Sequence, residues 1–82
     1  MSVLVLHRDR VLALLRRMHR SIPGGPVSRL VGAGVYWCTP TRDERGVAAE
    51  AVSAGLAVWS DGHVGKLLLA TRAGEAVRAE AA

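Results

Sequence analysis

Apolar residues recur three to four positions apart between residues 8 and 22, which is the spacing of one face of an α-helix. Arginines occupy many of the positions between them. We therefore predict an amphipathic helix over residues 8–22, ended by the Pro23–Pro26 segment, in which two prolines flank two glycines. The apolar stripe of this helix consists of Val11, Leu14, Leu15, Met18 and Ile22.

Residues 27–37 fit two structures. The apolar residues at the start of this segment have helical spacing, which indicates a short helix. Gly32 and Gly34 weaken a helix, however, and the Val35–Trp37 run is rich in residues that favour strands. A helix and a strand both remain open for this segment.

A helix start follows, and we predict a helix over residues 40–55 that ends at a glycine, the usual stop. Thr41 with Glu44 three residues later is the pattern of a capping box, while Thr39 followed by Pro40 offers an alternative cap. Spacing places Val47, Ala48, Ala51 and Val52 on the inner face and Arg42, Arg45, Ala49 and Ser53 on the outer face.

Residues 56–70 are expected to form a β-hairpin. Two β-prone runs flank Asp61-Gly62, a dipeptide that accepts the positive φ angles of a tight two-residue turn. Gly65 offers an alternative, in which a longer tip extends from Ser60 to Lys66.

Thr71 is expected to cap a last helix over residues 71–80. With 82 residues, of which half are apolar, the chain has enough material for one small α+β domain and no second core. Met1–Leu6 is apolar, and both an intramolecular strand or arm and a contact in a homodimer remain open for it.

The end of the chain resembles that of winged helix-turn-helix domains. Gly55-Leu56-Ala57 stands at the helix-to-strand corner, Asp61-Gly62 at the wing tip and Ala70-Thr71-Arg72-Ala73-Gly74 at the strand-to-helix corner. The match covers residues 39–80. It implies a small winged helix-turn-helix fold with three to four helices, in which residues 40–55 form the recognition helix and residues 56–70 the wing. Two features depart from the family: Ala70 replaces the usual leucine, and Gly32–Thr39 is longer than the usual turn between the second and third helices.

The resemblance also implies a double-stranded DNA partner, with the third helix in the major groove and the wing on the adjacent backbone. Arginine suits this role because it forms two hydrogen bonds to guanine O6 and N7, and the chain has no Asn or Gln to read adenine. Carried over, the groove face is Thr41, Arg42, Arg45 and Ala49, with Ser53 at its edge, and the wing contacts are His63 and Lys66.

The charge is divided unevenly. The chain carries 11 Lys+Arg and 7 Asp+Glu, a net charge of +4. Residues 1–30 have six arginines against Asp9, or +5, whereas residues 31–82 have five cations against six acids, or −1. DNA readers draw most of their affinity from neutralised phosphates, so the acidic half weakens the DNA hypothesis. A basic patch on the first helix, with only Asp9 as a nearby counter-charge, consists of Arg8, Arg10, Arg16, Arg17 and Arg20.

Two functions therefore stay open. The first is a DNA-binding regulator of transcription or of a mobile element, whose basic first helix also lies against phosphates. The second is a protein–protein interaction module on the same frame, because a fold does not fix a function. For Arg42 and Arg45, contact with nucleic acid and local pairing with Asp43, Glu44 or Glu50 both stay open. A symmetric dimer would place two third helices on successive half-sites of DNA.

Catalysis and cofactors find no support. The residues that most often bind metals are scattered, without a His pair at helical spacing or a CxxC motif, so we expect no enzyme, no metal site and no cofactor. Cys38 is expected to be a buried inert thiol. Trp37 and Trp59 are expected to pack in the core or at an edge, and with no Lys or Arg between them we expect no base-stacking platform. The longest apolar or Gly run, Leu30–Cys38, falls far short of the roughly 20 residues of a membrane helix. With no basic region before Met1–Leu6 to mark a secretory signal, we expect a soluble cytoplasmic protein.

Overall fold

Helices alternate with short strands along the chain. The computed structural model describes residues 7–62 and 65–80. The elements are α1 (Arg8–Arg17), β1 (His19–Arg20), α2 (Ser28–Val31), β2 (Tyr36–Cys38), the 3-10 turn η1 (Arg42–Glu44), α3 (Arg45–Ser53), β3 (Ala57–Gly62), β4 (Gly65–Ala70) and α4 (Arg72–Glu80). The expected α+β class is confirmed.

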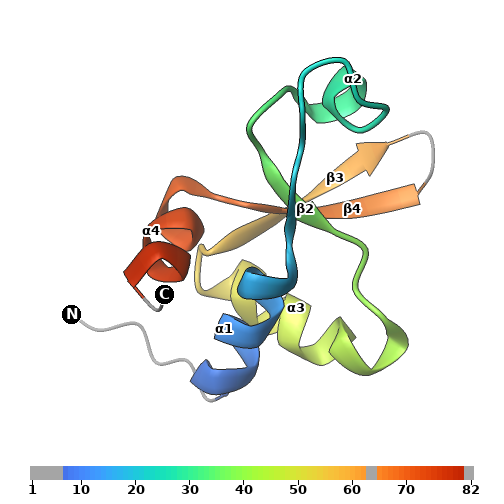
Figure 1. The fold of residues 1–82 in the computed structure, drawn as a ribbon. Helices are drawn as coiled ribbons and strands as arrows, with labels where there is room; N and C mark the ends of the chain where they lie inside the picture. Colours follow the sequence, from blue (N-terminus) through green and yellow to red (C-terminus); the bar gives the residue numbers. More distant parts are fainter. Residues whose placement is uncertain (1–6, 63–64, 81–82) are drawn as a thin grey trace.

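The four strands form one antiparallel sheet in the order β1-β2-β4-β3. The β1–β2 and β3–β4 pairs meet where β2 pairs with β4, and Figure 1 shows the two pairs steeply inclined to each other. Leu68 of β4 lies opposite Cys38 and Trp59, and the next residue, Leu69, lies opposite Trp37 and Val58. Because neighbouring residues of a strand point to opposite faces, these two rows belong to different sides of the sheet.

The core lies on the Leu68 side, between the sheet and the helices α1, α3 and α4. The expected stripe of α1 is confirmed as far as Met18, and the small side chains of α3 allow it to approach α1 closely. The fully buried residues with the largest side chains are Leu14, Leu15, Leu68, Val11 and Cys38. Burying a leucine side chain of this kind contributes about 2 kcal/mol.

The first helix is shorter than expected, because the chain leaves α1 at Met18 for an extended conformation with φ −61° and ψ 143°. Strand pairing explains the difference: the backbone N–H of Ser21 donates to the Val35 carbonyl at 2.8 Å, and the Gly34 N–H donates to the Ser21 carbonyl at 2.8 Å. Residues 19–21, predicted as part of the last turn of the helix, therefore make hydrogen bonds to a distant segment of the chain in place of helical ones. Ile22, expected on the buried stripe, is 68% exposed.

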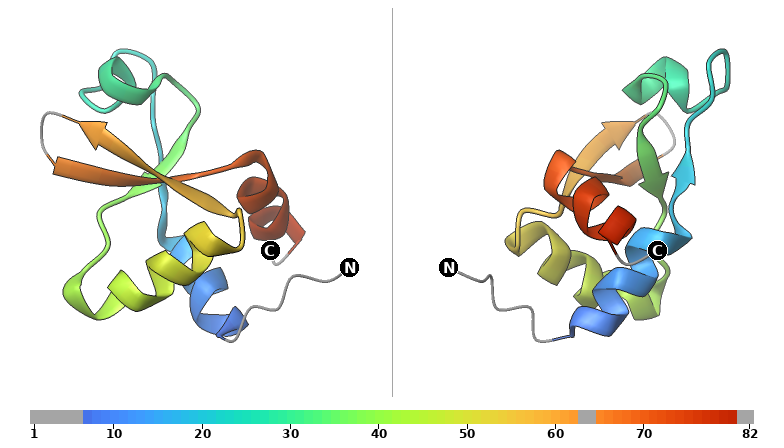
Figure 2. Two further views of the ribbon diagram at one scale, coloured as in Figure 1. Left: turned by 180° about the vertical axis from the view of Figure 1, so that it is seen from behind. Right: turned by 60° about the vertical axis from the view of Figure 1, so that its left-hand side comes forward.

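The segment 27–37 contains both of its candidate structures, the helix α2 and the strand β2. None of the residues of α2 is fully buried. Figure 2 shows α2 at the end of the molecule away from α1 and α3. Because β2 lies between α2 and α3, these helices are not joined by the short turn of a helix-turn-helix. The winged-helix interpretation therefore depends on α1, α3 and the β3–β4 hairpin.

The predicted helix over residues 40–55 begins as η1 and continues as α3. It ends in a Schellman motif, in which the Leu56 N–H donates to the Ala51 carbonyl at 2.9 Å and the Gly55 N–H to the Val52 carbonyl at 3.0 Å. The φ angle of Gly55 is +76°, which explains the glycine at this position.

The hairpin of residues 56–70 is present, but its turn is not at Asp61-Gly62. Asp61 pairs with Lys66 and Gly62 with Gly65, so β3 continues through the dipeptide to Gly62 and β4 begins at Gly65. Residues 63–64 lie outside the described chain. Pairing with the opposite strand outweighs the turn preference of Asp-Gly here.

Candidate nucleic-acid interface

The sequence predicts that the outer face of η1 and α3 enters the major groove of DNA. We call this surface the reading face. The expectation that this face points outward is confirmed: Ala48 and Ala51 are buried against the core. The exposed residues are Thr41, Arg42, Arg45, Ala49 and Ser53. Gly46 lies among these residues and leaves the helix backbone uncovered, since no atom lies within 4 Å of the place that a Cβ would occupy.

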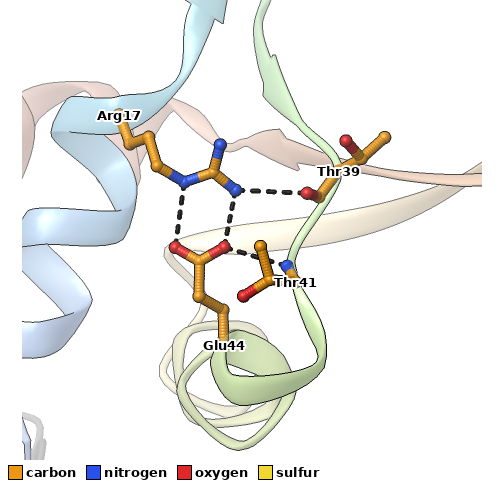
Figure 3. A network of polar contacts seen from close by, with 4 residues as sticks. All are labelled: Arg17, Thr39, Thr41 and Glu44. Carbon is orange, nitrogen blue, oxygen red and sulfur yellow. Dashed lines mark hydrogen bonds and ion pairs between the residues drawn. The ribbon is translucent and has the colours of Figure 1, made fainter.

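The start of this helix is held by a bidentate ion pair (Figure 3). Arg17, the last residue of α1, donates from Nε to Glu44 Oε2 at 2.9 Å and from Nη2 to Oε1 at 2.6 Å. Its Nη2 also donates to the Thr39 carbonyl at 3.1 Å. Glu44 in turn accepts a hydrogen bond from the Thr41 N–H at 2.9 Å, which completes the predicted capping box between these two residues. One arginine thus connects α1 to the segment that enters α3.

The ion pair changes the electrostatics of both partners. The hydrogen bonds from the Arg17 guanidinium, with that from Thr41, hold the pKa of the Glu44 carboxyl below its ordinary value. The same contact raises the pKa of Arg17. Arg17 is therefore not an uncompensated member of the basic patch, and the expectation that Asp9 is the only nearby counter-charge is wrong.

The acids of η1 and α3 face α1 rather than the reading face. Asp43 and Glu44 line a groove together with Arg10 and Arg17 of α1. Glu50 lies against the start of α1, where it accepts from the His7 N–H at 3.2 Å. The His7 Nδ1 lies 3.4 Å from the same carboxylate.

Arg42 and Arg45 have no carboxylate partner within 4.0 Å among the described side chains. The pairing with Asp43, Glu44 or Glu50 that the sequence left open is therefore not formed; Glu44 pairs with Arg17 instead, and Glu50 accepts from the His7 N–H. Within η1 and α3 the charges are therefore separated: the acids lie toward α1, and Arg42 and Arg45 lie on the exposed face.

Trp59 is a site residue that the sequence did not predict. It is 40% exposed and lines a hollow of about 530 Å³ together with Thr39, Pro40 and Arg45. Its place on the edge strand β3 agrees with the expected edge packing, and part of the indole stays exposed. The sequence contains a signal that Trp59 lies near Arg45. Counted from the corner at Gly55, Arg45 lies about 15 Å back along the helix and Trp59 about 13 Å onward along the strand. The two residues are therefore at similar distances from the corner.

The other predicted contacts are dispersed. Arg8, Arg10 and Arg16 are exposed on α1, whereas Arg20 lies on β1 and not on the first helix as expected. Lys66 lies in β4 opposite Asp61, near the tip of the hairpin. His63 and the arm at Met1–Leu6 lie outside the described residues.

Nothing in the described part of the chain forms a metal site, since it contains no group of three His, Cys, Asp or Glu side chains that could hold an ion. Burial raises the pKa of the Cys38 thiol to about 11, so the thiol stays protonated at neutral pH. None of the helices described, over residues 7–62 and 65–80, is long and apolar enough to cross a membrane.

No family model, curated protein or solved structure matches the chain. Its function must therefore be argued from the geometry of the η1–α3 face.

Proposed function

We propose that the chain is a small DNA-binding regulator, of transcription or of a mobile element, built on a winged-helix frame. The observation that carries the proposal is the separation of charge across η1 and α3. Glu44 pairs with Arg17 of α1 and Glu50 accepts a hydrogen bond from the His7 N–H beside the start of α1, while Arg42 and Arg45 remain on the exposed face. A helix with cations on one exposed face is what phosphate neutralisation and guanine readout require.

The small residues of α3 fit the same role. Ala49 and Gly46 are exposed on the reading face and leave room for the helix backbone to approach base edges. The β3–β4 hairpin follows α3 directly and would act as the wing, with His63 and Lys66 against the neighbouring backbone. Arg8 and Arg16, exposed on α1, add positive charge for phosphates further along the duplex.

The test is the salt dependence of binding to a random-sequence DNA duplex, measured by fluorescence anisotropy. Binding should weaken steeply with salt. The double variant Arg42→Ala, Arg45→Ala should bind more weakly, and the slope of log K against log salt should fall by about 1 for each phosphate that the variant no longer neutralises. Arg72→Ala is the matched control, because Arg72 is exposed on α4. Duplex that fails to bind at low salt, or a double variant that binds like the wild type, would rule the proposal out.

A second function, a protein-interaction module, is favoured by the other face of the sheet. There His19, Trp37, Leu69 and Val58 form one row across all four strands. Val58 is 46% exposed. A pull-down from native lysate with and without nuclease separates the two functions: a protein partner retained after nuclease and lost with Val58→Ser supports this second one.

A further inference from the structure

The hollow beside the start of α3 combines two kinds of wall. Trp59 and Pro40 provide apolar surface, Arg45 provides a cation, and Thr39 is the fourth lining residue. Its volume of about 530 Å³ lies within the range of small-molecule sites, roughly 300 to 1,000 Å³. The hollow is therefore large enough for one planar ring system with an attached anionic group.

Trp59 contributes little to the core that lies next to it. The core is closed by its neighbours on the same face, Ala57 and Leu68, which are 1% and 0% exposed. Trp59 lies further along β3, an edge strand of the sheet, and remains 40% exposed. Much of this large indole surface is consequently open to a ligand.

The hollow is also held in place. Thr39 forms one wall of the hollow, and its carbonyl accepts a hydrogen bond from Arg17. The ion pair between Arg17 and Glu44 fixes the turn that leads to Arg45. A site whose walls are fixed before binding loses less conformational entropy when the ligand enters. Arg45 has no carboxylate partner among the described side chains and remains available for an anion.

An indole beside an arginine matches the chemistry of a nucleotide. Base–aromatic stacking is favourable for every base, and a guanidinium binds a phosphate through two hydrogen bonds. A base within a duplex offers no free face, because its neighbours stack on both sides, so only an unpaired base can enter a hollow of this kind.

We propose that the Thr39–Pro40–Arg45–Trp59 hollow binds an unpaired nucleotide, with the base on Trp59 and the phosphate on Arg45. The inference rests on the proposed nucleic-acid function and adds to it a preference for strands with accessible bases.

The experiment compares three labelled ligands at low salt: a short oligothymidylate, an abasic strand of the same length and charge, and a duplex. The oligothymidylate should bind the wild type about tenfold more tightly than the abasic strand. Trp59→Ala should remove this difference and leave abasic binding unchanged, whereas Arg45→Ala should weaken both. Trp59→Phe should retain part of the difference. Val58→Ala is the matched control, since Val58 is exposed on the opposite face of the same strand.

Competition with thymidine monophosphate distinguishes a free nucleotide from a strand. If thymidine monophosphate displaces the oligothymidylate from the wild type but not from Trp59→Ala, the hollow binds a free nucleotide. If it displaces nothing, the hollow binds a nucleotide only within a strand. Both results agree with the inference. If the wild type binds oligothymidylate and the abasic strand equally well, the inference is wrong. This comparison uses only the wild-type protein, so it does not depend on whether a variant folds. If duplex binding persists in that case, the proposed function stands. If no nucleic acid binds, both fail.

Discussion

Gly74 shows why the motif at the end of the chain has its particular residues. The glycine is buried in the first turn of α4, and a Cβ at this position would overlap the Leu56 carbonyl oxygen. Thr71 caps α4 through its Oγ1, which accepts from the Gly74 N–H at 3.1 Å and donates to the Gly55 carbonyl at 2.6 Å. The two corners recognised in the sequence, at Gly55-Leu56 and at Thr71, therefore touch one another.

Gly74→Ala should destabilise the protein by about 2 kcal/mol, because the methyl group forces the two corners apart. Gly46→Ala is the matched control: it lies in α3 with nothing within 4 Å of its Cβ position and should stabilise the protein by about 0.5 to 1 kcal/mol. Urea unfolding measures both. Two variants that shift stability in the same direction would contradict the packing role of Gly74.

Glu44→Gln should reveal a pH-dependent contribution of the ion pair. Glutamine still accepts a hydrogen bond from the Thr41 N–H, so the variant removes the charge and keeps the cap. The folded pKa of Glu44 lies below the ordinary 4.5, so the pair adds stability above pH 4.5 and loses it as the pH falls through the lowered pKa. Because Arg17 is 39% exposed, we expect a loss of only about 1 kcal/mol at pH 7.

Urea titrations at pH 7 and at strongly acidic pH check this expectation: wild type and Glu44→Gln should converge in acid. Glu80→Gln is the control, since Glu80 is exposed at the end of α4. A difference between wild type and Glu44→Gln that does not change with pH would show that the ion pair contributes nothing.

Among the elements, those with local signals were predictable and those set by long-range pairing were not. The capping box of Thr41, the glycine stop at Gly55 and the cap at Thr71 all act within a few residues, and all are found as predicted. The turn of the β3–β4 hairpin was missed because strand pairing continues through Asp61-Gly62. The end of α1 was missed because it depends on a strand partner distant in sequence. Ser21, for example, bonds to residues 11 to 14 positions further on.

The candidate site divides in the same way. The exposed face of α3 followed from helical periodicity alone, so Arg42 and Arg45 were found. Counting residues from Gly55 places Trp59 at the level of Arg45, but their shared hollow and the removal of Arg17 from the basic patch required the packing of α1 and β3 against α3. Spacing along one element carries no information about which elements meet.

Ser21→Ala tests how the loop that carries α2 is held. The side chain is 4% exposed, donates to the Gly32 carbonyl at 2.7 Å and accepts from the Val35 N–H at 2.9 Å. Alanine leaves both backbone groups without this partner, which should cost roughly 1 to 3 kcal/mol. Amide hydrogen exchange at Val35 should also become faster.

The control for the loop is Ser28→Ala. Ser28 Oγ donates to the Gly25 carbonyl at 2.8 Å, a local bond that does not cross between β1 and β2. We expect a cost below about 1 kcal/mol in urea unfolding and no change in exchange at Val35. If Ser28→Ala destabilises the protein as much as Ser21→Ala, the bond across the loop has no special role.

At the scale of the whole molecule, α4 connects the helical layer to the sheet. Arg78 donates from Nε to the Leu15 carbonyl near the end of α1 at 3.0 Å. Its guanidinium carbon also lies 4.3 Å from the centre of the Tyr36 ring on β2. One side chain thus contacts α1 and β2 at once, at the junction from which Arg17 reaches the start of α3. Arg78 itself lies on α4 and does not belong to the reading face.

Arg78→Ala should therefore lower stability by about 2 kcal/mol, because it removes a charged hydrogen bond and a cation–π interaction. Arg72→Ala, an exposed change on the same helix, should stay within about 0.5 kcal/mol of the wild type. Thermal and urea unfolding measure both. Because Arg78 holds the frame and does not contact phosphate, folded Arg78→Ala should keep the wild-type salt slope in duplex binding, unlike the Arg42→Ala, Arg45→Ala protein. A reduced slope would place Arg78 in the nucleic-acid interface and redraw its boundary.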